Sequence, residues 1–139
     1  MPAYNRFPDT QPPPVSPSTS FLLLHTAEIG DTIVEYSSWY AGMNQDRVRL
    51  VFERSIAVRH VLEHLSEASG QTDVGELPES RWLSTLHKEQ ARLFPSMPEH
   101  FRSIRHYFVV GHDTIIEVLA EGLGWRLLRA GEALLMSAA

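Results

Sequence analysis

The chain contains no cysteine, which excludes disulfide scaffolds, thiol nucleophiles and cysteine-ligated zinc. This absence favours a reducing compartment, and we expect a cytoplasmic protein. No stretch approaches the roughly 18 apolar residues of a membrane span, and the N-terminus lacks the basic and apolar segments of a signal peptide. We therefore expect neither export by a classical signal nor insertion into a membrane.

Lysine is nearly absent, because eleven of the twelve basic residues are Arg and the other is Lys88. Acidic residues number 17, which gives a net charge of -5. An acidic surface repels phosphate backbones, so nucleic acid is not an expected partner. The 139 residues are 43% apolar and 21% charged, values that predict one globular domain with its own core.

Six of the nine prolines lie in residues 1–20, where no hydrophobic periodicity is visible. This composition predicts an extended, proline-rich leader over residues 1–20, followed by a single globular domain over residues 21–139. The stretch "PPPVSP" is either a simple linker or a segment that docks on an aromatic groove of a partner.

Alternation of apolar and polar residues predicts strands within residues 21–42 and 47–62. In the second segment a hairpin or bulge at residues 53–55 would join two strands. Two further apolar runs flank "GHD", residues 111–113, in the form of a hairpin, and "GLG" then turns into a last run. We expect these C-terminal runs to form a β-meander.

The period changes in "RWLSTLHKEQARLF", which predicts a helix over about residues 79–94 that ends at Pro95. The polar stretch 66–80 before it is expected to be loop. A lone amphipathic helix must cover one face of a sheet to bury its apolar stripe. The sequence therefore predicts an α+β fold, with a curved antiparallel sheet of five to seven strands and one main helix packed on it.

The stretch "RHVLEH" matches H-x-x-E-H, a zinc-peptidase signature, with His60 and His64 as ligands and Glu63 as base. Glu67 or Glu132 is a candidate third ligand. If the strand continues to residue 62, however, the two imidazoles lie about 13 Å apart and cannot share a metal. A small zinc-dependent hydrolase is therefore the alternative, and our main expectation is no catalytic residue, metal or cofactor.

Other constellations favour binding over catalysis. No serine lies in a G-x-S-x-G elbow, and no phosphate-binding loop is present. Trp39 and Tyr40 are neighbours on an expected strand, so one of them faces outward and is a candidate interface anchor. Glu117, on the expected wet face of the sheet, and Asp113, in the "GHD" turn, complete the candidate partner-binding residues.

The segments "DRVRLVFERSIAVRHVLE", "SRWLSTL" and "RHYFVVGHDTIIEVLAEG" together resemble a group of small uncharacterised bacterial α+β proteins, some of which are immunity proteins of toxin systems. The resemblance covers residues 21–129. It implies a non-enzymatic module that binds a protein partner, a toxin being one candidate, since acidic inhibitors suit basic partners. A homodimer, or a component of a larger assembly docked by residues 1–20, are further alternatives.

Overall fold

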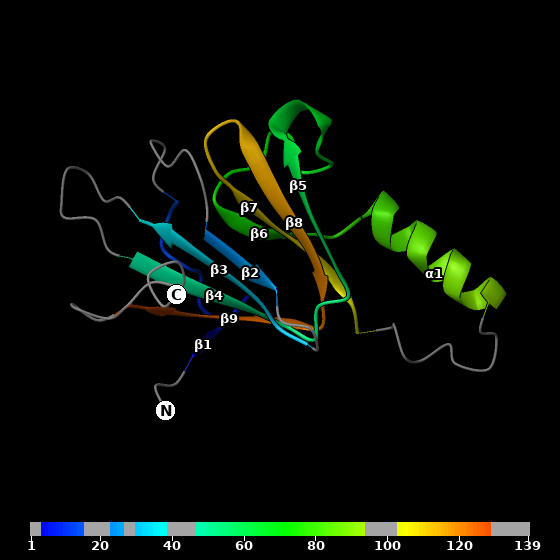
Figure 1. Ribbon diagram of the computed structural model, residues 1–139, viewed down its shortest axis with the longest axis horizontal. Helices are drawn as coiled ribbons and strands as arrows, with labels where there is room; N and C mark the ends of the chain where they lie inside the picture. The colour runs from blue at the N-terminus through cyan, green and yellow to red at the C-terminus, as the bar shows by residue number, and fades with distance from the viewer. Residues whose placement is uncertain (1–3, 16–22, 27–29, 39–46, 94–102, 129–139) are drawn as a thin grey trace.

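A computed structural model describes residues 4–15, 23–26, 30–38, 47–93 and 103–128 (Figure 1). Within these ranges the chain forms nine β-strands, the 3-10 helix η1 (Glu63–Leu65) and the α-helix α1 (Arg81–Leu93). All strand pairs between named strands are antiparallel. The predicted α+β class, with antiparallel pairing and one α-helix, is confirmed for the described residues.

The strands form two sheets in place of the single curved sheet of five to seven strands that the sequence predicts. The first sheet has the order β1 (Asn5–Arg6), β9 (Gly122–Leu127), β4 (Arg47–Glu53), β3 (Thr32–Ser37) and β2 (Leu23–Thr26). The second has the order β5 (Ala57–Leu62), β8 (Thr114–Ala120), β7 (Arg105–Val110) and β6 (Val74–Leu77). The single-sheet prediction is wrong because it assumes that short connections join neighbours within one sheet, whereas the connections after β4 and after β8 lead into the other sheet.

The connection between β4 and β5 is a bulge, which was one of the two predicted alternatives. Glu53 pairs with Gly122 in the first sheet and Ala57 pairs with Leu119 in the second. Three residues thus lie on one strand opposite two on the other, and the extra residue bends the ladder. Arg54 has a φ of 49° there. One continuous ladder therefore passes from the first sheet into the second.

The C-terminal runs form a hairpin but no meander. β7 and β8 pair as predicted, and Asp113 occupies the turn between them with a φ of 63°. β9, however, leaves the second sheet and lies between β1 and β4 in the first. The chain thus crosses between the sheets a second time, directly opposite the bulge.

The core lies between the facing surfaces of the two sheets. Its fully buried side chains come from both sheets and include Val34, Leu50 and Phe52 from the first and Val109, Ile116 and Val118 from the second. Burial of each such side chain contributes about 1.5–3 kcal/mol. Tyr107 packs against Phe52 with ring centroids 5.7 Å apart, and burial raises the pKa of Tyr107 to about 12.

Residues 4–15 lie within the packed structure, inside the range predicted as a leader. β1 pairs with β9, and Val15 is buried. The hydroxyl of Tyr36 donates to the carbonyl of Pro13 at 2.6 Å, and the indole of Trp125 donates to the carbonyl of Thr10 at 3.0 Å. These contacts hold the described part of the proline-rich segment against the first sheet.

β6 lies within residues 66–80, which the sequence predicts as loop. Its four residues are too few to show alternation, and Gly75 removes one side chain from the pattern. The absence of a side chain at Gly75 leaves room for the Phe108 ring on the neighbouring strand β7, because a Cβ there would lie 2.6 Å from Cζ of Phe108. β6 therefore depends on a close approach that composition does not reveal.

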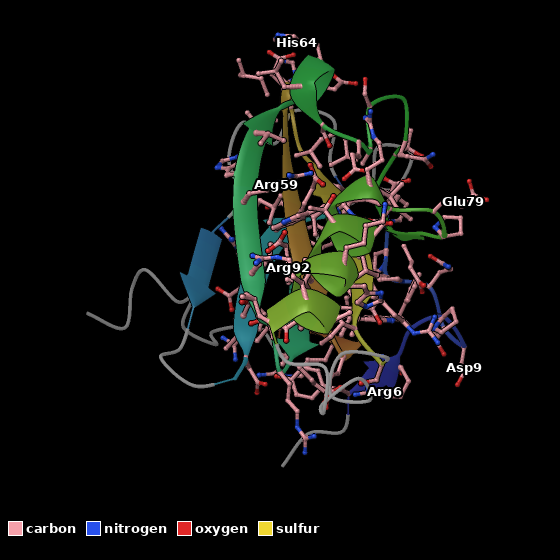
Figure 2. All side chains as sticks on the ribbon, turned by 90° about the vertical axis from the view of Figure 1, so that its right-hand side faces the viewer. Arg6, Asp9, Arg59, His64, Glu79 and Arg92 are labelled. Atoms are coloured by element: carbon pink, nitrogen blue, oxygen red, sulfur yellow. The ribbon has the colours of Figure 1, made fainter. Side chains whose placement is uncertain are left out.

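α1 confirms the predicted helix to within two residues at each end. The helix lies outside the second sheet, on the face turned away from the core (Figures 1 and 2). None of its residues is buried, so its packing on the sheet is looser than predicted. In the part of the chain that the structure describes, no helix is long and apolar enough to cross a membrane.

Candidate functional site

Polar side chains meet on the outer face of the second sheet, where α1 begins. Ile116 and Val118 face the core, so Glu117 between them points to the opposite face. Arg59 is its direct partner on β5, and His106 lies on the neighbouring strand β7. Glu117 and His106 are nevertheless 0% exposed. Two ionisable groups are thus withdrawn from water, which is costly unless each is paired.

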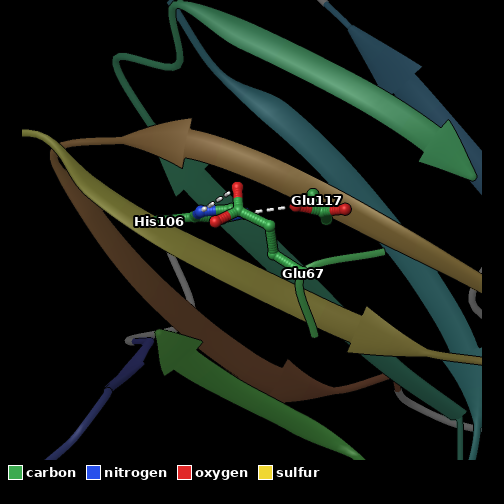
Figure 3. Close-up of side chains that lie close together, drawn as sticks. All are labelled: Glu67, His106 and Glu117. Atoms are coloured by element: carbon green, nitrogen blue, oxygen red, sulfur yellow. Dashed lines mark hydrogen bonds and ion pairs between the residues drawn. The ribbon is translucent and has the colours of Figure 1, made fainter. Parts of the chain in front are cut away.

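Glu117 is fully paired. One carboxylate oxygen accepts from His106 Nε2 at 2.5 Å, the contact drawn in Figure 3, and from Arg59 Nη2 at 2.9 Å, and the other accepts from the Ser66 hydroxyl at 2.9 Å. A carboxylate oxygen accepts hydrogen bonds and does not donate them. His106 must therefore carry its proton on Nε2.

His106 links Glu117 to the start of α1. Its Nδ1 lies 2.5 Å from the Ser80 hydroxyl, and because Nε2 is the donor, Nδ1 accepts the hydroxyl proton. Burial lowers the pKa of His106 below its ordinary value, against the raising effect of Glu117, so the ring is neutral. The Ser80 oxygen also accepts the amide of Leu83 at 2.9 Å, which makes Ser80 the helix N-cap.

Glu67 accepts hydrogen bonds from two further backbone amides in the first turn of α1. Its two carboxylate oxygens accept from the amides of Arg81 at 2.7 Å and Trp82 at 3.0 Å. Arg59 adds an ion pair at 3.2 Å. Burial opposes ionisation of Glu67, but the two amide hydrogen bonds, with Arg59 nearby, lower its pKa. A carboxylate at a helix N-terminus also gains from the helix dipole.

Arg59 and Trp82 complete the site. The guanidinium of Arg59 reaches from β5 toward α1 (Figure 2) and lies 4.0 Å from the centre of the Trp82 ring. Trp82 also meets His106 edge-on, with ring centroids 5.4 Å apart. We call Arg59, Ser66, Glu67, Ser80, Trp82, His106 and Glu117 together the α1 anchor. It fixes the first turn of the helix to three different parts of the second sheet.

The α1 anchor contains a set of metal-ligating types. Ligand atoms of Glu67, His106 and Glu117 lie within 4.8 Å of one another. A histidine with two carboxylates suits zinc, manganese or iron. Arg59, however, is hydrogen-bonded to both carboxylates and already supplies a positive charge between them. The arrangement thus fits an ion-pair network better than a metal centre.

The predicted zinc motif is divided between two elements. His60 lies on β5 and His64 in η1 with Glu63, and all three side chains are exposed. An H-x-x-E-H peptidase requires both histidines on one face of a helix. That arrangement is not formed, because the strand continues to Leu62. Glu67 belongs to the α1 anchor, and Glu132 lies outside the described residues.

The four predicted partner-binding residues lie in different environments or outside the described residues. Trp39 and Tyr40 lie outside the described residues. Glu117 is completely buried in the α1 anchor and is not available to a partner, because the face predicted to be wet is covered. Asp113 is exposed at the tip of the β7–β8 turn, 3.2 Å from His112. Of the four residues, Asp113 alone is seen on the surface of the described structure.

The α1 anchor was missed because its members are distant in the sequence. Ser66 and Glu67 follow η1, Ser80 precedes α1, and Arg59, His106 and Glu117 come from three strands. Only Ser80 gives a local signal, since a serine directly before an amphipathic helix is typical of an N-cap.

Comparison with protein-family models, with curated proteins and with solved structures returned no match. The function must therefore be argued from the geometry.

Proposed function

We propose that the protein is a protein-binding module and that α1 is its contact element. The observation that carries the proposal is that α1 is strongly amphipathic and yet has no buried residue. A helix that only covers a sheet buries its apolar stripe against it. Here the stripe is only partly buried, and Leu93 at its end is exposed.

The accessible stripe consists of apolar side chains at helical spacing. Trp82, Leu83 and Leu86 are half-buried, and Leu93 at the end of the helix is 53% exposed. Leu93 and Leu86 lie seven residues apart, on one side of the helix. Stripes of this kind occupy hydrophobic grooves on other proteins, with side chains at intervals of three, four and seven residues as anchors.

Charge indicates the kind of groove. α1 carries Arg81, Lys88 and Arg92 against the single acidic residue Glu89, whereas the whole chain has a net charge of -5. A basic helix on an acidic protein suits a partner whose apolar groove has an acidic rim. The same acidic body repels other acidic surfaces, so the helix is the favoured point of approach.

The α1 anchor supports this role, because it holds the first turn of the helix in one orientation before any partner binds. The capping bonds from Ser80 and Glu67 and the Arg59–Trp82 contact fix that turn to the sheet. Ordering a helix during association costs affinity, and a pre-ordered helix avoids that cost.

The proposal is tested by retaining proteins from an extract of the source organism on the immobilised full-length chain and on two variants. Leu93→Asp places a charge in the accessible stripe. Ala91→Asp places the same charge on the opposite side of α1, where the side chain is also exposed. We expect one protein to be retained by the parent chain and Ala91→Asp but not by Leu93→Asp, and to bind as a purified protein with the same preference. Equal retention by all three chains would count against α1 as the contact element.

A toxin-neutralising immunity protein is a second candidate, favoured by the net charge of -5, which suits a basic toxin. Such a toxin would approach the acidic body and not the basic helix. Co-expression with the products of the genes flanking its own separates the two candidates. Rescue from toxicity that Leu93→Asp leaves unchanged supports neutralisation through another surface, and no rescue from any product excludes this candidate.

A further inference from the structure

Ser80, His106 and Glu117 form an unbroken chain of hydrogen bonds from a hydroxyl through an imidazole to a carboxylate. The hydroxyl lies 2.5 Å from Nδ1 of His106, and Nε2 lies 2.5 Å from Glu117. We propose that Ser80 is a nucleophile, with His106 as its base and Glu117 as the positioning residue, and that it attacks small carboxylic esters. This activity is independent of protein binding through α1.

The protonation states required for nucleophilic attack are those that the contacts impose. Glu117 accepts from Arg59, from Ser66 and from Nε2 of His106, so the imidazole proton lies on Nε2 and Nδ1 accepts the proton of Ser80. The triad of serine hydrolases assigns the same three roles, although there the serine faces Nε2 and the carboxylate faces Nδ1. The roles depend on proton acceptance and orientation, which either ring nitrogen can provide.

Ser80 lies where the buried network meets an open depression of about 570 Å³. The depression is lined by the end of the loop before α1 and by one side of the first two turns: Pro78, Glu79, Ser80, Arg81, Leu83, Ser84, His87 and Lys88. The base is shielded from water while the nucleophile is at the wall of a space that admits a small molecule. Such a combination is typical of reactive sites.

In the reaction, a bond forms between Oγ of Ser80 and the ester carbonyl carbon while the hydroxyl proton passes to Nδ1 of His106. The bond from that carbon to the leaving oxygen then breaks, and Nδ1 returns the proton to the departing alcohol. Water hydrolyses the acyl-serine to a carboxylic acid and restores the hydroxyl. No redox partner is needed.

The lining indicates the substrate class and the rate. The lining contains two cations, Arg81 and Lys88, against the single acid Glu79, which favours esters that carry a negative charge. The amides of the first turn of α1 are not available to the developing oxyanion, since Glu67 occupies those of Arg81 and Trp82 and Ser80 that of Leu83. Loss of one such donor slows catalysis about 10²–10³-fold. We therefore expect slow turnover and a persistent acyl-serine.

A fluorophosphonate reports such a nucleophile directly, because Oγ displaces fluoride from phosphorus and the adduct is stable. The full-length chain is treated with a biotin-linked fluorophosphonate and the modified residue is located by mass spectrometry. We expect modification of Ser80 at least tenfold above that of Ser84. Ser84 is the matched control, since it lines the same depression and has no bond to His106 among the described contacts. Ser80→Ala abolishes the labelling.

Two measurements separate reactivity from mere exposure. In a folded His106→Gln variant the labelling of Ser80 falls at least tenfold. Should that variant not fold, the pH profile of the parent chain decides, because labelling driven by His106, facing Glu67, Glu117 and Arg59, is lost below a midpoint under 6.5. Equal labelling of Ser80 and Ser84, or labelling that persists in the heat-unfolded chain, would overturn the proposal.

Discussion

The guanidinium of Arg59 lies 4.0 Å from the centre of the Trp82 ring and also donates to the buried carboxylate of Glu117. One side chain thus joins the edge strand β5, the central strand β8 and the first turn of α1. Because Arg59 provides the guanidinium that pairs with both Glu117 and Glu67, the anchor depends on it more than on any single cap.

Replacement of Arg59 by Met is expected to destabilise the fold by about 2–3 kcal/mol, below the 3–5 kcal/mol found for fully buried pairs because the Arg59 side chain is 35% exposed. Urea denaturation measures the loss. Arg105→Met is the matched control, since Arg105 pairs with Glu76 on the surface and its removal costs about 1 kcal/mol or less. Similar losses for both variants would contradict a special role for Arg59.

Glu67→Gln tests the cap of α1. Glutamine keeps one acceptor oxygen and loses the charge, so we expect a loss of about 1 kcal/mol. The readout is hydrogen exchange of the Arg81 and Trp82 amides, which should accelerate, while amides of β4 keep their protection in proportion to the global stability. Unchanged exchange at both amides would show that Glu67 does not cap the helix in solution.

Acid should destabilise the protein through His106. Its pKa is lowered in the folded state, so the folded chain binds fewer protons than the unfolded chain once the pH falls below about 6.5. Stability is therefore full above that pH and decreases as the pH falls. Glu67, whose pKa is lowered below 4.5, adds a second loss at lower pH. Urea denaturation between pH 8 and pH 3 measures both, and a folded His106→Gln variant should lack the first decrease.

Gly75→Ala should cost about 1–3 kcal/mol, because the new Cβ would lie 2.6 Å from the ring of Phe108. Phe108→Leu opens that space at its own cost. The double variant should be more stable than the sum of the two single losses indicates. Strict additivity would mean that the two residues are not in contact in solution.

Deletion of residues 1–15 should destabilise the domain although the composition predicts a leader. The deletion removes β1 and the acceptors of Tyr36 and Trp125, each bond being worth about 1 kcal/mol, and uncovers both rings. Thermal unfolding followed by tryptophan fluorescence reports the change near Trp125. An unaltered transition would place these residues outside the cooperative unit.

The sequence predicted the elements better than their arrangement. Alternation located β4 and β5, the apolar runs around "GHD" located β7 and β8, and the period of 3.6 located α1. Alternation says nothing about which strand is the neighbour. Because of the bulge at Arg54, β4 and β5 lie in different sheets. The crossing at Glu121 likewise places β8 and β9 in different sheets, although each pair was predicted to be neighbours.

The site was harder to predict than the fold. The sequence predicts that Glu117 faces water, because acids on a strand usually do. A single histidine within an apolar run, as His106 is, gives no local signal of a site. Their burial results from the cover provided by residues 66–82 and from donors on other elements. A charged residue inside a strand becomes informative only when its partners are known, and here these come from positions up to 58 residues away.

The ladder shared by the two sheets also bears on how the chain is made. Strands β4 and β5 leave the ribosome early, but their partners β9 and β8 are among the last described residues to be synthesised. Until then the apolar faces of β3, β4 and β5 have no cover from the second half of the chain. Pairing of such distant segments is slow and favours association of incomplete chains. A chain that stops before Thr114 should therefore need a chaperone to stay in solution, whereas the complete chain should not.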